Sequence, residues 1–200
     1  MVSAAGGWYT SYTMMMEMFG GVFVMMLFAY SLIPLFPFVY VVLRWRQARE
    51  GEPADPQLGL KVALHYFATL GMHVVLIALV AVLYSFLVDS KFAQEMMMRS
   101  GGGLLIGGGV VYGVHRAMLA RVTDSARRPN VARVFAGLNV VLCGLIGMSA
   151  LIIASVMLCQ EHVSEDGLKI AFVLMLVYLG AWGLHARRLI GYIEAAKPVA

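Results

Sequence analysis

The amino-acid sequence predicts an all-α protein that crosses a membrane with five helices. Apolar residues make up 61% of the 200 residues, charged residues make up 13%, and the mean hydropathy is +0.82. Soluble domains are about half apolar and a quarter charged, so this composition lies outside their range. Several stretches without charged residues approach the roughly 20 residues that a helix needs to cross a bilayer. These stretches are continuous and do not alternate, which disfavours a transmembrane β-barrel.

The chain is predicted to form a single membrane domain over residues 1–200. The first span follows a group of aromatic residues typical of the membrane interface, and we expect Pro34 and Pro37 to kink it. The second span carries no charge but includes His65 and His73, the third is short and rich in glycine, and the fourth and fifth repeat the alternation of a long and a short stretch. The five predicted spans are 18–43, 62–88, 100–115, 134–159 and 170–186.

The distribution of basic residues predicts the orientation of these spans. Segments 44–61, 116–133 and 187–200 hold twelve of the fifteen lysines and arginines, and the opposite connections hold three. Because cytoplasmic segments of membrane proteins are enriched in basic residues, we expect the N-terminus outside and the C-terminus in the cytoplasm. The predicted location is the plasma membrane, which in a bacterium is the inner membrane.

Residues 56–120 and 129–190 resemble each other, which indicates a tandem repeat of one helical hairpin. A shift of 73 residues places Gly71 on Gly144, and a shift of 70 places Tyr112 on Trp182. Both segments end in a similar pattern, YGVHR in the first and WGLHAR in the second. Duplication would make the first span an addition to two repeated hairpins, whereas chance similarity between apolar helices is the competing explanation.

The third predicted span contains seven glycines, which helical spacing places on three stripes. Small residues let membrane helices approach closely, so we expect five of these glycines to pack against other helices of the chain. Packing against another copy of the chain is the alternative. One stripe holds Gly102, Gly109 and Gly113, a second holds Gly103 and Gly107, and a third holds Gly101 and Gly108.

Four histidines are the candidate cofactor ligands. His73 is expected near the middle of the bilayer, where an ionisable residue either has a functional role or is a neutral imidazole bonded to its neighbours. His65, His115 and His185 are expected at the cytoplasmic ends of their helices. The expectation is that no cofactor binds; the alternative is a haem b held between His65 and either His115 or His185.

The sequence favours a protein without catalytic activity. It contains no metal-ligand cluster, nucleophile elbow or P-loop. We therefore expect a structural or accessory subunit of a larger membrane complex, in contact with the lipid bilayer and with a membrane-protein partner or a second copy, and with no nucleic acid. One alternative is a transporter or channel for a small solute or lipid, and another is a haem-bearing electron carrier. A polar path for transport would draw on Ser31, His73, Asn139, Ser149 and Ser155.

Overall fold

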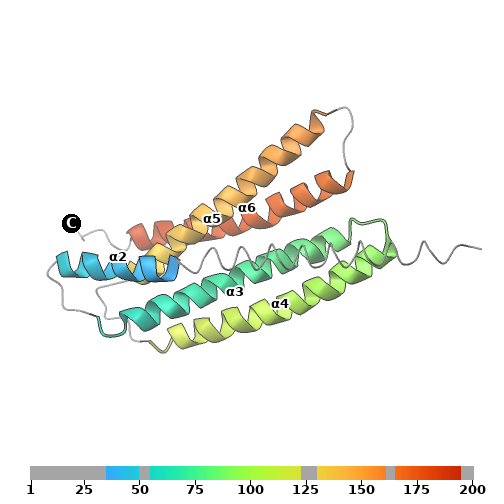
Figure 1. The fold of residues 1–200 in the computed structure, drawn as a ribbon. Helices are drawn as coiled ribbons and strands as arrows, with labels where there is room; N and C mark the ends of the chain where they lie inside the picture. Colours follow the sequence, from blue (N-terminus) through green and yellow to red (C-terminus); the bar gives the residue numbers. More distant parts are fainter. Residues whose placement is uncertain (1–34, 50–54, 123–129, 161–164, 195–200) are drawn as a thin grey trace, which may run out of the picture. The chain divides into compact units, whose positions relative to one another are not determined.

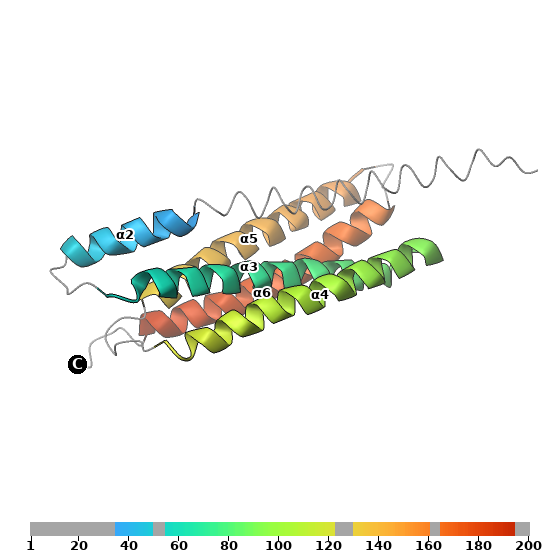
Figure 2. The same ribbon diagram turned by 60° about the horizontal axis from the view of Figure 1, so that its bottom comes forward.

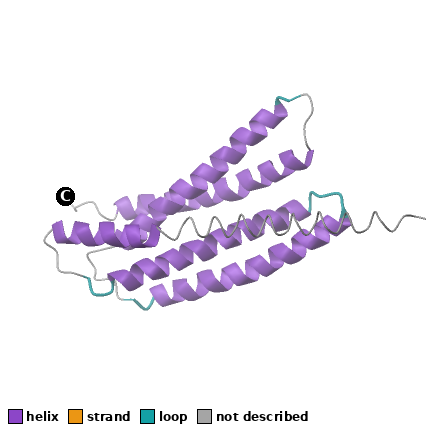
Figure 3. Cartoon of the chain, viewed as in Figure 1, coloured by secondary structure: helices purple, strands orange, loops and turns teal. Residues whose placement is uncertain are grey.

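The computed structural model describes residues 35–49, 55–122, 130–160 and 165–194, and every regular element in these ranges is a helix (Figures 1 and 3). The helices are α2 (Leu35–Arg49), α3 (Leu58–Ser85), α4 (Lys91–Leu119), α5 (Asn130–Leu158) and α6 (Glu165–Glu194). Of these, α3, α5 and α6 are long and apolar enough to cross a membrane. The prediction of an all-helical chain compatible with a membrane is confirmed, whereas five spans and their orientation stay predictions.

The chain divides into two compact units, Met1–Ala54 and Asp55–Ala200. In the first unit, α2 continues beyond the predicted end of the first span and carries Arg49, whose guanidinium lies 5.4 Å from the centre of the Trp45 ring. Most of that predicted span, including Pro34, lies outside the described residues. The kink expected at the two prolines therefore stays a prediction.

The second unit consists of two helical hairpins, α3–α4 and α5–α6 (Figures 1 and 2). Helix α3 holds them together, because it contacts α4 within its own hairpin and both helices of the other hairpin. A polar contact also joins the hairpins, since Lys169 Nζ of α6 lies 3.3 Å from Asp89 Oδ2 in the α3–α4 connection. The four helices form one packed unit with α3 at its centre.

The helices of this unit are nearly equal in length, with 28, 29, 29 and 30 residues. The third and fifth predicted spans are therefore only parts of α4 and α6. The helices continue past the charged residues that delimit those spans. In each of the two helices, one of these charged residues forms an ion pair with a residue four positions away on the same helix. Arg99 lies 3.4 Å from Glu95, and Lys169 lies 2.8 Å from Glu165. Such pairs, four residues apart, stabilise a helix surface.

Local capping fixes where these helices begin. The Ser90 hydroxyl accepts a hydrogen bond from the Ala93 amide at 3.4 Å and caps α4. Before α3, the Asp55 carboxylate accepts hydrogen bonds from the Gln57 amide and from Lys61 Nζ, both at 2.9 Å. The Ser90 and Asp55 side chains thus each satisfy one backbone amide that a helix start leaves without an intrahelical partner.

Two glycines form the crossing point of α3 and α4. A Cβ atom on Gly71 would lie 2.6 Å from the Tyr112 backbone nitrogen and 3.1 Å from the Gly108 carbonyl oxygen. A Cβ atom on Gly108 would lie 2.8 Å from a Val74 methyl group and 3.1 Å from the Gly71 carbonyl oxygen. The two backbones therefore approach each other more closely than any side chain at either position would allow. Gly101 makes a similar contact with Val82, at 2.8 Å.

The glycines predicted to pack lie elsewhere on α4. A Cβ atom on any of the five would have no atom of another described helix within 4 Å. These five are Gly102, Gly103, Gly107, Gly109 and Gly113. The contacts inside the chain come from the third stripe, Gly101 and Gly108, because that stripe faces α3. Packing of the other two stripes against a second protein stays a prediction.

At equivalent positions of the two hairpins, a glycine lies against an aromatic residue of the neighbouring helix. A Cβ atom on Gly71 would lie 2.6 Å from the backbone nitrogen of Tyr112, whereas one on Gly144 would lie 3.0 Å from the Trp182 ring. These are the glycine and aromatic positions that the shifts of 73 and 70 residues superimpose. The ion pairs described above, Glu95 with Arg99 and Glu165 with Lys169, are also 70 residues apart.

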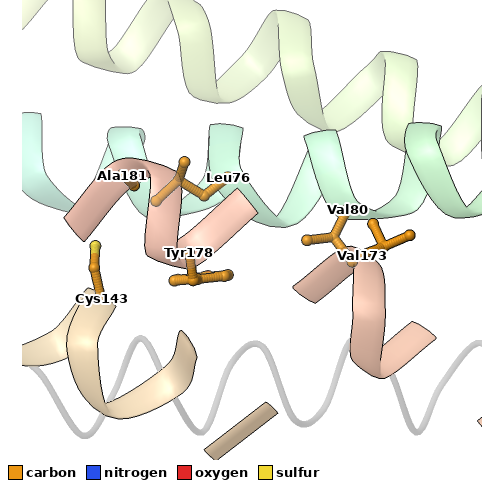
Figure 4. Packing of buried hydrophobic residues seen from close by; sticks show 6 residues of the cluster. All are labelled: Leu76, Val80, Cys143, Val173, Tyr178 and Ala181. Atoms are coloured by element: carbon orange, nitrogen blue, oxygen red, sulfur yellow. The ribbon is translucent and has the colours of Figure 1, made fainter. Parts of the chain in front are cut away.

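The apolar core of the unit lies where α3, α5 and α6 meet. Its buried residues are Leu76 and Val80 of α3, Cys143 of α5, and Val173, Tyr178 and Ala181 of α6. Val80 and Val173 project toward each other, and Leu76 lies beside Ala181 (Figure 4). Tyr178 is the largest of these side chains, at 2% exposure, and its ring stacks on His73 with centroids 6.2 Å apart.

Candidate functional site

A polar cavity of about 210 Å³ lies at the end of the four-helix unit where α3 and α5 begin and α4 and α6 end. All four helices contribute to its wall. The lining residues are His65, Ala68, Thr69, Met72, Tyr112, Arg116, Ala132, Phe135, Ala136, Asn139, His185, Arg188 and Tyr192. None of these thirteen side chains is acidic, so the wall carries positive charge from its arginines.

The inner part of the cavity is formed by buried polar side chains. Thr69, Asn139 and His185 are between 6% and 7% exposed. Asn139 Nδ2 donates a long hydrogen bond of 3.5 Å to Thr69 Oγ1, whereas the buried Asn139 Oδ1 has no hydrogen-bond partner among the described residues.

The two histidines of the cavity are held by neighbouring side chains and backbone. His65 Nδ1 donates to the Lys61 carbonyl at 2.9 Å, and its ring stacks on Phe135 with centroids 5.5 Å apart. His185 Nε2 lies 2.9 Å from the Met72 sulfur, a contact between the two hairpins. These contacts fix both imidazoles in the wall.

The outer part of the cavity carries two arginines from different hairpins, Arg116 of α4 and Arg188 of α6. Both are exposed, and neither forms an ion pair with a carboxylate among the described residues. Tyr112 and Tyr192 lie beside them in the wall, each partly buried. The cavity therefore combines an exposed cationic rim with a buried, neutral floor.

The structure brings together two of the four histidines predicted as cofactor ligands. His65 and His185 line the cavity, whereas His115 does not. His115 Nδ1 donates to the Val111 carbonyl of its own helix at 2.7 Å, and its ring lies 5.2 Å from that of Phe67. His73 is 1% exposed, stacks on Tyr178 and interacts with the Asn139 side chain, as expected for an imidazole bonded within the core.

A haem between His65 and His185 does not fit this arrangement. Pockets for drug-sized ligands measure about 300–1,000 Å³, and a haem needs more space than the cavity offers. His185 also directs Nε2, the usual ligating nitrogen, at the Met72 sulfur. Among the described residues, no group of three or more His, Cys, Asp or Glu side chains is placed to hold a metal ion.

The polar residues proposed for a transport path do not lie together. His73 and Asn139 are neighbours in the core, but the Ser155 hydroxyl is exposed and donates to the Leu151 carbonyl of its own helix. Ser149 lines a separate apolar groove of about 600 Å³ between α5 and α6. Helices α5 and α6 diverge toward the end of α5 and the beginning of α6 (Figure 1). Ser31 lies outside the described residues.

Five polar residues of the cavity, Thr69, Tyr112, Arg116, Arg188 and Tyr192, were not among the predicted site residues. Their spacing carries a signal, because polar residues recur every three or four positions at these helix ends. His65 precedes Thr69 by four, and Tyr112 precedes Arg116 by four. The series from His185 through Arg188 to Tyr192 follows the same helical spacing. Membrane topology explains why Arg116 and Arg188 are basic, but it does not explain why they line the same cavity as the histidines.

Comparison of the chain with known protein families, with characterised proteins and with solved structures finds no match.

Proposed function

We propose that the protein is a non-enzymatic integral membrane protein that serves as a structural or accessory subunit of a larger complex in the plasma membrane. The observation that carries this proposal is the open glycine surface of α4. It consists of the five glycines that contact no other described helix, Gly102, Gly103, Gly107, Gly109 and Gly113.

Helix α4 packs against α3 and makes no comparable contact with α5 or α6. Large apolar side chains stand between the glycines, and Ile106 and Val110 are 72% and 59% exposed. Lipid chains gain little from a glycine-lined surface, whereas another helix can approach it closely and pack against the flanking side chains. The open glycine surface is therefore suited to a helix from a partner membrane protein.

Substitution of Gly107 tests this assignment. We expect the wild-type protein, purified in mild detergent, to retain a stoichiometric membrane-protein partner, and we expect Gly107→Leu to release it because leucine occupies the space of the incoming helix. Gly180→Leu is the matched control, since Gly180 is also open but lies on α6. Native mass spectrometry gives the stoichiometry, and size-exclusion chromatography checks that each variant is folded.

Three results would contradict the subunit proposal. They are a wild-type protein that purifies as a monomer, one that purifies only with further copies of itself, and a Gly107→Leu variant that keeps its partner. A pure homo-oligomer would instead favour the transporter alternative.

Two further properties belong to this proposal. Residues 56–120 and 129–190 are two copies of one hairpin, supported by the equivalent contacts of Gly71 with Tyr112 and of Gly144 with Trp182. In the proposed arrangement, all four helices of the second unit and the first predicted span cross the membrane with the N-terminus outside, which the distribution of basic residues supports.

Labelling of cysteines tests the orientation. Cys159 is exposed at the end of α5, on the side predicted to lie outside, whereas Cys143 is 0% exposed. A membrane-impermeant maleimide added to intact cells is expected to label the wild-type protein and the Cys143→Ser variant, but not Cys159→Ser. Labelling that requires inside-out vesicles would show the opposite orientation.

A further inference from the structure

We propose that the polar cavity between the two hairpins binds the phosphate group of a small ligand or of a lipid. The proposal concerns a different part of the molecule from the open glycine surface, so it does not depend on the subunit assignment. It rests on the two arginines of the rim, the buried polar groups of the floor and the size of the cavity.

The rim supplies the charge for a phosphate group. Arg116 and Arg188 line the same cavity from different hairpins, and none of the described residues in its wall is acidic. Planar guanidinium groups bind phosphate oxygens through paired, charge-assisted hydrogen bonds, which are stronger than bonds between neutral groups. A phosphate between these arginines would also join α4 to α6, two helices that make little contact with each other.

The floor supplies a further group suited to binding. Asn139 is 6% exposed, and its Nδ2 donates a long hydrogen bond of 3.5 Å to Thr69 Oγ1. The Thr69 hydroxyl keeps its own proton, which can be donated to a ligand oxygen. The floor thus adds neutral hydrogen-bonding groups to the charge of the rim.

The cavity volume limits the ligand. A volume of about 210 Å³ corresponds to roughly seven water molecules at about 30 Å³ each, which accommodates a phosphate group with a few attached atoms. The exposed rim leaves such a group open to the surroundings at the helix ends. Two sources share this chemistry, a phospholipid headgroup and a free phosphate.

Binding measurements on the full-length protein in a non-ionic detergent test the proposal. Isothermal titration uses two probes, inorganic phosphate and short-chain dioctanoyl phosphatidic acid, and we expect saturable binding of at least one of them to a single site. Binding of inorganic phosphate assigns the site to a free anion. Binding of the phosphatidic acid alone assigns it to a lipid headgroup.

Four variants locate the site. Arg116→Gln and Arg188→Gln are each expected to weaken binding about tenfold or more, because each removes a charge-assisted contact. Arg187→Gln is the matched control, since Arg187 is the exposed neighbour of Arg188 and does not line the cavity. Asn139→Asp preserves the shape of the floor but adds a negative charge, so it is expected to abolish binding. Size-exclusion chromatography and circular dichroism establish that each variant is folded.

Two results would overturn the proposal. One is the absence of saturable binding of either probe to the wild-type protein. The other is an equal loss of affinity in Arg187→Gln and Arg188→Gln, which would show general attraction to basic helix ends. If Asn139→Asp fails to fold, the comparison of the three arginine variants still decides, because all three residues are exposed.

Discussion

Replacement of Gly71 by leucine is expected to abolish the folded four-helix unit. A Cβ atom at this position would already lie 2.6 Å from the Tyr112 backbone nitrogen, and the remaining leucine atoms would extend into α4. The backbone of α4 cannot yield as a flexible side chain could, so the helices must separate. Because α3 is the helix that joins both hairpins, separation at this crossing affects the whole unit.

A graded series makes this prediction quantitative. Gly71→Ala is expected to lower the free energy of unfolding by about 1–3 kcal/mol, the usual cost of overpacking a filled site. Gly108→Leu should behave like Gly71→Leu, since the two glycines face each other. Gly107→Leu is the control, one residue along α4, where no described helix is in contact. The measurements are the yield of monodisperse protein and the apparent Tm in detergent. If Gly107→Leu lowers the yield and the Tm as much as Gly108→Leu does, close packing at Gly108 is refuted.

Truncation of Tyr178 is expected to produce the second-largest effect. Tyr178→Ala removes an aromatic ring from the centre of the core, where it packs near Leu76 and stacks on His73. Large-to-small substitutions of buried aromatic residues cost about 3–5 kcal/mol, in part because the remaining cavity is not refilled. For a chain of this length, that loss corresponds to an apparent Tm lowered by about 6–20 °C. Thermal unfolding followed by circular dichroism in detergent measures the shift.

Two variants separate the packing of Tyr178 from other effects. Leu176→Ala lies on the same helix but changes a side chain that is 57% exposed, so it should shift the Tm far less. Tyr178→Phe keeps the ring and removes only the hydroxyl. A Tm of Tyr178→Phe as low as that of Tyr178→Ala would mean that the hydroxyl, and not the ring, stabilises the core.

The composition and the uncharged stretches were sufficient to predict the helical class and its compatibility with a membrane. They were not sufficient to predict which glycines pack. Seven glycines surround α4 on three stripes, so its sequence alone favours no face. Gly108 packs against α3 because it faces Gly71, where the absence of a side chain lets the two backbones approach each other. Gly101 lies on the same stripe and therefore also faces α3.

The sequence singled out two residues of the cavity but not the cavity itself, for a related reason. His65 and His185 were identified because histidines are rare in apolar helices and draw attention individually. Their neighbours Arg116 and Arg188 had a complete explanation in membrane topology, and their shared cavity arises only when α4 and α6 are brought around α3. Helical spacing within one helix can reveal a polar face, but it does not specify the helix that the face meets.

The equal lengths of the four helices conceal an unequal distribution of charge along them. In α3 and α5 the uncharged stretches, 62–85 and 134–158, rise about 36 Å, whereas those of α4 and α6, 100–115 and 170–186, rise only about 25 Å. A bilayer core is about 30 Å thick, so in the proposed membrane arrangement the uncharged stretches of α4 and α6 are about 5 Å shorter than the core, whereas those of the other two helices are long enough to tilt. Lipids next to α4 would be compressed, at a cost that grows with each ångström of mismatch. A partner helix with a similarly short apolar stretch would replace those compressed lipids, so hydrophobic thickness would select the partner together with the shape of the glycine surface.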